Sequence, residues 1–152
     1  MNVIVDTSVW SHVLRRPQAG RSSLHDELQE LIREGRVVML GPIRQELLSG
    51  LRTEQQFKKL RDGLRAFPDY RLAAEDFEDA ATCFNRCRSK GIQGSNTDFL
   101  ICSVGIRNDF EIFTTDGDFA NFGKALPVKL YSERLRGRSL TRRGRARNAG
   151  RR

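Results

Sequence analysis

Short apolar runs alternate along the chain with longer segments whose apolar residues recur every three or four positions. The short runs are typical of buried strands and cover 2–5, 37–40, 111–116 and 127–131. The longer segments predict helices over 8–15, 22–35, 42–50, 53–66, 73–90 and 96–108, with a further helix or turn from 118. Because strands and helices alternate, we predict an α/β fold with a parallel sheet that carries helices on both faces.

Capping residues fix some of the predicted helix ends. Thr53 and Gln56 have the spacing of a capping box at the start of one helix. Asn96 or Thr97 is expected to cap the helix over 96–108. These residues predict where the two helices begin.

The positive charge of the chain is concentrated at its C-terminus. The 152 residues include 27 Lys and Arg against 19 Asp and Glu, a net charge of +8. Residues 134–152 hold nine arginines and no acid, so residues 1–133 carry 18 basic and 19 acidic side chains and a net charge of −1. We therefore expect one folded domain over 1–133 and a disordered Arg-rich tail over 134–152, which has too little apolar surface to offset its ordering entropy.

The composition indicates a cytoplasmic protein. No apolar run approaches the roughly 18 residues of a membrane span, and the N-terminus lacks the pattern of a signal peptide. The three cysteines follow no zinc-binding spacing, and Cys83 and Cys87 lie four positions apart, as expected for a reduced pair packed on one helix face.

Four acidic residues stand at related positions in the predicted fold. Asp6 ends the first strand, and Asp116 ends the third. Glu46 lies on the helix after the second strand, and Asp98 lies in the first turn of another helix. Strand ends and the starts of the following helices share one rim of a parallel sheet. The four side chains are therefore candidates for one site.

Such a cluster would have a specific chemistry. Carboxylates held together repel one another, and a bound cation relieves the repulsion. Oxygen ligands favour Mg²⁺ or Mn²⁺, and such ions assist phosphate chemistry.

Each acid also has a simpler interpretation. Asp6 can cap the helix that starts near Ser8, and Asp98 can stabilise a helix N-terminus. Glu46 can be an ordinary solvated helix residue, and residues 116–118, Asp-Gly-Asp, are typical of a turn. The spacing alone leaves open whether the four carboxylates meet.

Four motifs together resemble a known family. The segments VIVDTSVW, PIRQELLSG, NTDFLICSVG and TTDGDFANF occur in this order and look like the motifs of PIN-domain ribonucleases, more narrowly of the VapC toxins of bacterial toxin–antitoxin pairs. The resemblance covers residues 1–131. It implies a PIN-like three-layer α/β/α fold with a central, mostly parallel sheet and an acidic pocket for Mg²⁺ or Mn²⁺.

The resemblance also implies a set of functional residues. The matching catalytic acids are Asp6, Glu46, Asp98 and Asp116, and the metal ligands are Asp6, Asp98, Asp116 and, more variably, Asp118. Supporting hydroxyls are expected from Thr7, Ser8 and Thr115.

The activity implied by the resemblance is metal-dependent hydrolysis of RNA phosphodiesters by an endoribonuclease. Because the acids repel RNA, basic residues must bind it, and the candidates are Arg15, Arg16, Arg44 and the tail. The family implies two partners, a cognate antitoxin and a second copy of the chain docked through the early helices. The tail is a departure, since VapC toxins usually end close to the last strand.

Three other classes of protein share parts of this pattern. Aspartyl-nucleophile phosphatases and phosphotransferases place a second Asp two positions after the first, where this chain has Ser8. Receiver domains require paired acids after the first strand and a Lys near the site, and the motifs supply neither. The alternative of a different kind is a catalytically idle RNA-binding module driven by the Arg-rich tail.

Overall fold

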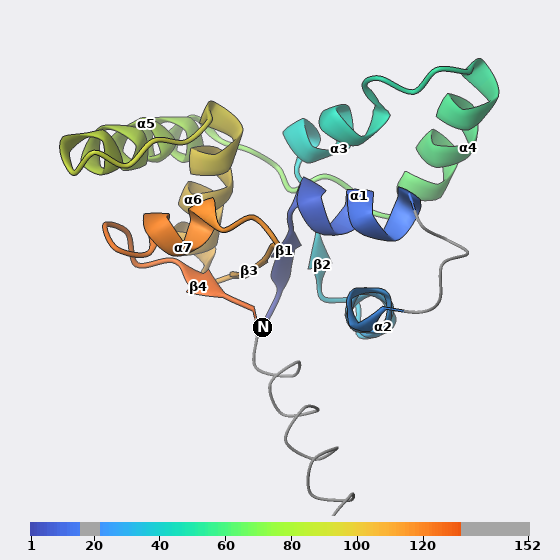
Figure 1. Ribbon diagram of the computed structural model, residues 1–152, viewed down its shortest axis with the longest axis horizontal. Helices are drawn as coiled ribbons and strands as arrows, with labels where there is room; N and C mark the ends of the chain where they lie inside the picture. The colour runs from blue at the N-terminus through green and yellow to red at the C-terminus, as the bar shows by residue number, and fades with distance from the viewer. Residues whose placement is uncertain (16–21, 132–152) are drawn as a thin grey trace, which may run out of the picture.

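The computed structural model describes residues 1–15 and 22–131 of the chain (Figure 1). The predicted tail at 134–152 and Arg16 lie outside the described residues. The helices are α1 (Thr7–Arg15), α2 (Ser23–Arg33), α3 (Gly41–Leu48), α4 (Glu54–Leu64), α5 (Ala74–Ser89), α6 (Asn96–Asn108) and α7 (Asp118–Phe122). The strands are β1 (Val3–Val5), β2 (Val37–Val38), β3 (Glu111–Phe113) and β4 (Lys129–Leu130).

The four strands form one sheet in the order β2-β1-β3-β4, and every pairing is parallel. Ile4 stands opposite Val38 on one side and Ile112 on the other, so β1 is central. Helices flank the sheet, with α5, α6 and α7 grouped on the side of β3 and β4 and α1 to α4 on the side of β2 (Figure 1). The predicted α/β fold is confirmed. The carboxyl ends of all four strands consequently lie at one edge.

The core explains why such short strands suffice. All three residues of β1 are fully buried, as expected for a strand covered on both faces. The aromatic part of the core includes Phe99 of α6, Phe113 of β3, and Phe119 and Phe122 of α7, all almost completely inaccessible. The ring of Phe122 packs against those of Phe99 and Phe119. These contacts pack α7 against the start of α6.

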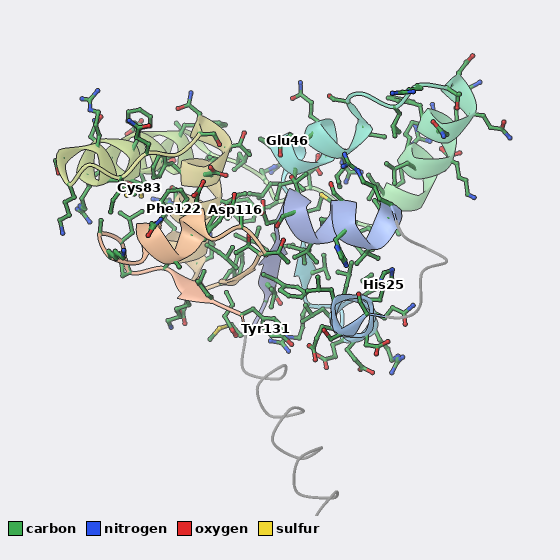
Figure 2. All side chains as sticks on the ribbon, viewed as in Figure 1. His25, Glu46, Cys83, Asp116, Phe122 and Tyr131 are labelled. Atoms are coloured by element: carbon green, nitrogen blue, oxygen red, sulfur yellow. The ribbon has the colours of Figure 1, made fainter. Side chains whose placement is uncertain are left out.

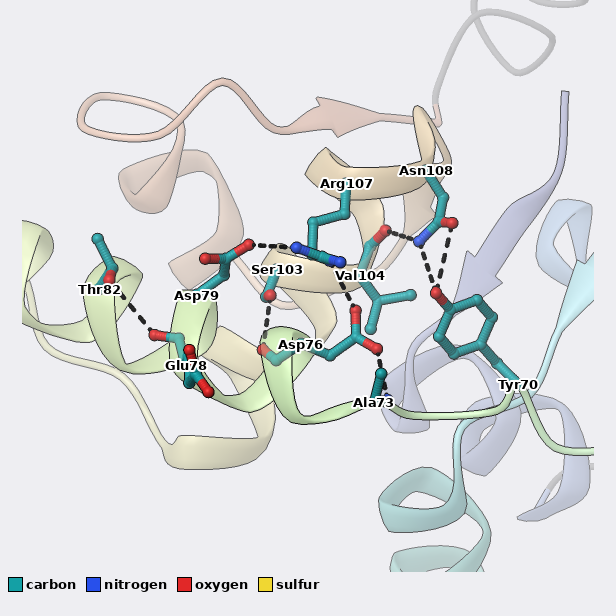
Figure 3. A network of polar contacts seen from close by, with 10 residues as sticks. All are labelled: Tyr70, Ala73, Asp76, Glu78, Asp79, Thr82, Ser103, Val104, Arg107 and Asn108. Carbon is teal, nitrogen blue, oxygen red and sulfur yellow. Dashed lines mark hydrogen bonds and ion pairs between the residues drawn. The ribbon is translucent and has the colours of Figure 1, made fainter.

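A polar network joins α5 to α6 and the segment before α5 (Figure 3). Asp76 is 1% exposed, and its carboxylate accepts hydrogen bonds from the backbone N–H of Ala73 at 2.9 Å and from Arg107 at 3.0 Å. Arg107 reaches Asp79 as well, and Ser103 donates to the backbone oxygen of Asp76. The two helices are thereby held in one relative position.

Several predicted boundaries differ from those observed. β3 ends at Phe113, so Asp116 lies in the following loop and not at the strand end. The cap of α6 is Ser95, not Asn96 or Thr97, because the Ser95 hydroxyl accepts the N–H of Asp98. Thr53 caps α4 as predicted.

One further feature accords with the sequence analysis. Cys83 and Cys87 are free thiols buried on one helix. Within the described part of the chain, no helix combines the length and apolar character that crossing a membrane requires.

Candidate active site

The acidic cluster, which we define as Asp6, Glu46, Asp98 and Asp116, lies at the carboxyl edge of the sheet. Asp6 directly follows β1, and its backbone N–H donates to the Phe113 oxygen at 2.9 Å, which carries the pairing of β1 and β3 to the strand ends. Glu46 from α3 and Asp116 from the loop after β3 are found at this same end of the molecule (Figure 2). Parallel pairing therefore places acids from distant parts of the sequence together.

Two hydroxyl groups hold the carboxylate of Asp6. Thr114 and Ser8 each donate a hydrogen bond to its Oδ2 atom at 2.8 Å. The Thr114 hydroxyl also accepts the N–H of Asp116 at 3.0 Å, and the Ser8 hydroxyl accepts the N–H of Thr115 at 3.1 Å. Asp6 is 6% exposed, so these bonds compensate a charge that has little contact with water.

The hydroxyl groups that contact Asp6 differ in part from those expected from the sequence. Ser8 holds Asp6 as predicted. The structure uses Thr115 through its backbone N–H, and it is the hydroxyl of Thr114 that reaches the carboxylate. Sequence reasoning missed Thr114 because the motif TTD offers two adjacent hydroxyls and its letters do not distinguish them.

Glu46 is positioned from α1. The Thr7 hydroxyl donates to its Oε2 atom at 2.7 Å, so the predicted supporting hydroxyl serves Glu46 and not its neighbour Asp6. Glu46 itself is exposed. This bond between α1 and α3 brings a solvated carboxylate to the edge where Asp6 is buried.

Asp98 occupies the third position of α6 and forms a reciprocal capping box with Ser95. Its carboxylate accepts the Ser95 N–H at 3.1 Å, and its own N–H donates to the Ser95 hydroxyl at 3.1 Å. Burial raises the pKa of Asp98, and the charges of Asp6 and Asp116 raise it further, against the opposing effect of the Ser95 hydrogen bonds. Asp98 thus lies within electrostatic range of both other carboxylates. The expected role of Asp98 at the N-terminus of this helix is therefore confirmed.

Asp118 stands at the margin of the site. Its N–H donates to the Asp116 carboxylate at 2.9 Å, which is the local bond of a turn. Asp118 is exposed in the first turn of α7. The turn predicted for residues 116–118 is therefore present, and it orients Asp116.

The donor set suits a hard divalent cation in its chemistry. All the converging atoms are carboxylate and hydroxyl oxygens, the ligands of Mg²⁺ and Mn²⁺. The pKa of Asp98 is raised mainly by burial and in smaller part by the charges of Asp6 and Asp116, and a bound cation would oppose both effects. Over the ranges 1–15 and 22–131, however, no group of three or more His, Cys, Asp or Glu side chains is arranged to hold a metal ion as it stands.

The two described candidates for RNA contact differ in their surroundings. Arg15 is exposed at the end of α1. Arg44 donates to the Asp69 carboxylate at 2.9 Å, to the Leu64 oxygen at 3.0 Å and to the Phe67 oxygen. Its guanidinium therefore ties α3 to the segment after α4. Arg16 falls outside the described residues.

Comparisons with known proteins agree with this architecture. The family model described as PIN domain matches residues 3–125. Among curated proteins, a search finds no match.

Three solved structures share the fold. VapBC2 from Rickettsia felis, crystallised with a DNA fragment from the promoter, is 18% identical with a TM-score of 0.71 over 86% of this chain and 98% of that one. FitAcB from Neisseria gonorrhoeae is 18% identical with a TM-score of 0.69 over 86% and 96%. A toxin–antitoxin complex from Klebsiella pneumoniae is 17% identical with a TM-score of 0.57 over 78% and 91%. Since the family model spans most of the sequence, the chain belongs to the PIN domain family.

Proposed function

We propose that this protein is a metal-dependent endoribonuclease, the toxin of a VapBC-type toxin–antitoxin pair. The observation that carries the proposal is the Thr114 hydroxyl, which donates to the Asp6 carboxylate and accepts the N–H of Asp116, so that two acids are held at the carboxyl edge of the sheet. An accumulation of negative charge at that edge disfavours binding of the RNA backbone unless a cation intervenes. PIN-domain membership and the toxin–antitoxin complexes with the same fold support the same function.

The acids at the carboxyl edge of the sheet would bind the metal ion, and neighbouring hydroxyl groups would orient them. Asp6, Asp98 and Asp116 would hold the cation, with Asp118 as a further ligand at the margin. When bound, Mg²⁺ or Mn²⁺ would polarise the phosphoryl oxygens and acidify a water molecule. Ser8 and Thr114 both donate to the Oδ2 atom of Asp6 and so fix the orientation of its carboxylate.

Glu46 is suited to orienting the attacking water. Thr7 occupies its Oε2 atom, and its Oε1 atom has no hydrogen-bond partner among the described residues. The exposed carboxylate can therefore accept a proton at Oε1 without breaking an existing contact.

The toxin–antitoxin complexes with this fold also support an antitoxin partner. A second copy docked through the early helices is consistent with the apolar side chains of Leu14 and Ile32, which are 40% and 39% exposed on α1 and α2. Light scattering on the purified chain tests this homodimer by giving twice the 17.4 kDa mass.

Cleavage of RNA by the purified chain tests the activity. We expect cleavage with Mg²⁺ or Mn²⁺ and none with EDTA, and we expect Asp98→Asn to reduce the rate at least 100-fold, as loss of a key catalytic group does. Asn retains an oxygen that can accept the Ser95 N–H, so the capping box of α6 is preserved and only the charge is lost. Asp62→Asn, at an exposed position of α4, is the matched control and should cleave normally.

Two results would contradict the proposal. Equal cleavage by wild type and Asp98→Asn would assign the activity to a contaminant. RNA binding without any cleavage across transfer, ribosomal and messenger RNA substrates would instead support the idle binding module driven by the Arg-rich tail.

A further inference from the structure

The helix α3 carries Glu46 and depends on its neighbours for its position. It spans only Gly41–Leu48, and its N-cap residue, Leu40, makes no side-chain capping bond. Helices of this length are marginal in water on their own, so tertiary contacts decide where they lie. α3 packs against both α1 and α4 (Figure 1). The contacts on these two sides therefore determine where Glu46 stands.

Arg44 and Glu46 project from α3 on opposite sides of its buried face, which Ile43 and Leu47 form. Successive residues of an α-helix turn by about 100°, so Arg44 lies about 100° from Ile43 in one direction and Glu46 about 60° from it in the other. On its side, the Glu46 carboxylate accepts the hydrogen bond from the Thr7 hydroxyl of α1. A rotation of α3 that moved Arg44 would consequently move Glu46 as well.

The Arg44 guanidinium binds protein oxygens through all three of its nitrogen atoms. Its Nε atom donates to the Asp69 carboxylate at 2.9 Å, and its two terminal nitrogens donate to the backbone oxygens of Leu64 and Phe67. Leu64 is the last residue of α4, where carbonyl groups lack an α-helical partner. The Arg44 side chain is only 22% exposed. Its position is therefore set by these three acceptors.

The segment that receives Arg44 is itself fixed to the sheet. Asp69 forms a parallel bridge with Met39, which directly follows β2. The N–H of Tyr70 donates to the Met39 oxygen at 2.8 Å. Arg44 thus joins α3 to a backbone segment that is hydrogen-bonded at the sheet edge, and not to a free loop.

An aromatic contact completes a circuit between α1, α3 and this segment. The ring of Phe67 packs edge-on against that of Trp10, with 5.3 Å between the ring centroids. Trp10 lies about one turn after Thr7 on α1. The contacts that run from Thr7 to Glu46, and from Arg44 through Phe67 to Trp10, therefore begin and end on the same helix. A shift of α3 breaks at least one of them.

We propose that Arg44 is a positioning residue, which clamps α3 so that the Glu46 carboxylate keeps its place beside Thr7. For its effect on catalysis this inference rests on the proposed function, in which Glu46 orients the attacking water. A phosphate contact is the competing role for Arg44. That role needs only positive charge, which Lys also supplies, whereas the clamp needs the planar fork of a guanidinium.

Hydrogen exchange of the full chain, followed by mass spectrometry, tests the clamp without any catalysis. Arg44→Lys keeps the charge and loses the fork. We expect the amides of α3 to exchange about tenfold faster in this variant, with β1 and α6 unchanged. Arg61→Lys is the matched control, because Arg61 of α4 also donates its Nε atom to a carboxylate, that of the adjacent Asp62. This control should leave exchange in α3 as it is in wild type.

RNA cleavage with Mg²⁺ tests the consequence for Glu46. We expect Arg44→Lys and Arg44→Gln to lower kcat alike, by about tenfold, with KM unchanged, since a small misplacement near the reacting atoms has effects of this size or larger. In a Glu46→Gln background the same changes should have little further effect, because the carboxylate that they position is already gone. Asp69→Asn loosens the same clamp without altering α3, so it is a milder variant that should act in the same direction.

The outcomes separate this inference from the proposed function. Unchanged exchange in α3 of Arg44→Lys overturns the clamp, whatever the activity. Normal kcat in Arg44→Lys with a raised KM in Arg44→Gln would make Arg44 a phosphate contact and overturn the inference. Losses of kcat that multiply with that of Glu46→Gln would overturn it as well, because a general weakening of the fold acts equally in both backgrounds. Faster exchange in α3 without any cleavage by wild type would support the clamp and count against the nuclease.

Discussion

Thr114 shows how one hydroxyl can organise a charged site. The Thr114 hydroxyl donates to the Asp6 carboxylate and accepts from the N–H of Asp116. One hydroxyl oxygen therefore links the residue after β1 to the loop after β3. A hydroxyl can do this because it is both donor and acceptor, whereas a carboxylate only accepts. Two negatively charged residues are thereby held at one edge of the sheet without direct contact between their carboxylates.

The raised pKa of Asp98 leads to a prediction for the metal-free protein. A carboxyl group whose pKa is higher in the folded state than in the unfolded state destabilises the fold when it ionises, and this penalty disappears as the pH falls below both pKa values. We therefore expect Asp98→Asn to unfold at a higher temperature than wild type at pH 7. The difference should vanish near pH 3, where the Asp98 carboxyl is protonated in both states.

With Mg²⁺ bound, wild type should become the more stable of the two proteins. Mg²⁺ stabilises a protein only in proportion to its binding to the folded state, so it should raise the melting temperature of wild type and not that of Asp98→Asn. Calorimetric scans at pH 7 and pH 3, with and without Mg²⁺, measure both effects. If Asp98→Asn is less stable than wild type at pH 7 without metal, the prediction is wrong, because the charge of Asp98 would then stabilise the fold.

Single residues of the site were only partly predictable from the sequence. Asp6 and Ser8 stand together in one motif, and their contact is local, so their pairing follows from the letters. The bond from Thr7 to Glu46 spans 39 positions and depends on how α1 packs on α3. The structural use of Arg44 depends likewise on carbonyl groups of Leu64, the last residue of α4, and of Phe67 beyond it, which no sequence pattern identifies.

At the scale of elements, the Asp76 network couples α5 to α6 (Figure 3). We expect Asp76→Ala to lower the free energy of unfolding by about 1.5–3 kcal/mol, because it removes charge-assisted hydrogen bonds to a buried carboxylate. Asp79→Ala removes the exposed contact of the same Arg107 and should cost about 1 kcal/mol or less. Urea unfolding of both variants measures the difference. An equal loss of unfolding free energy in both variants would mean that the buried Asp76 contributes no more to stability than the exposed Asp79.

Elements were more predictable than their contacts. Every strand and helix is present near its predicted position, because apolar periodicity reports which side of an element is buried. The ends of strands were less accurate: the sequence predicts a strand to residue 116, whereas β3 ends at Phe113. Ser95 was missed as a cap because Asn96 and Thr97 have the same capping preference and follow it directly.

At the scale of the whole molecule, charge divides the chain into two unequal parts. Residues 1–133 have a net charge of −1, whereas residues 134–152 carry nine arginines. The acidic cluster belongs to the first part, so the proposed function would assign catalysis and long-range attraction to RNA to different segments. If the protein is a nuclease of this kind, removing the arginines of 134–152 should lower its affinity for RNA and leave its catalytic rate unchanged.

Replacing the nine arginines of 134–152 by glutamine in the full chain tests this division. We expect kcat for RNA cleavage to stay unchanged, because the substitutions leave all four acids in place, while KM rises and becomes less sensitive to salt. Each phosphate contact that is lost should reduce the slope of log affinity against log salt by about 0.7 for a single strand. If the protein is instead a catalytically idle module driven by its tail, the variant should not bind RNA at any salt concentration, and neither protein should cleave it. The salt series therefore separates the two functions, because only the nuclease retains a tail-independent kcat.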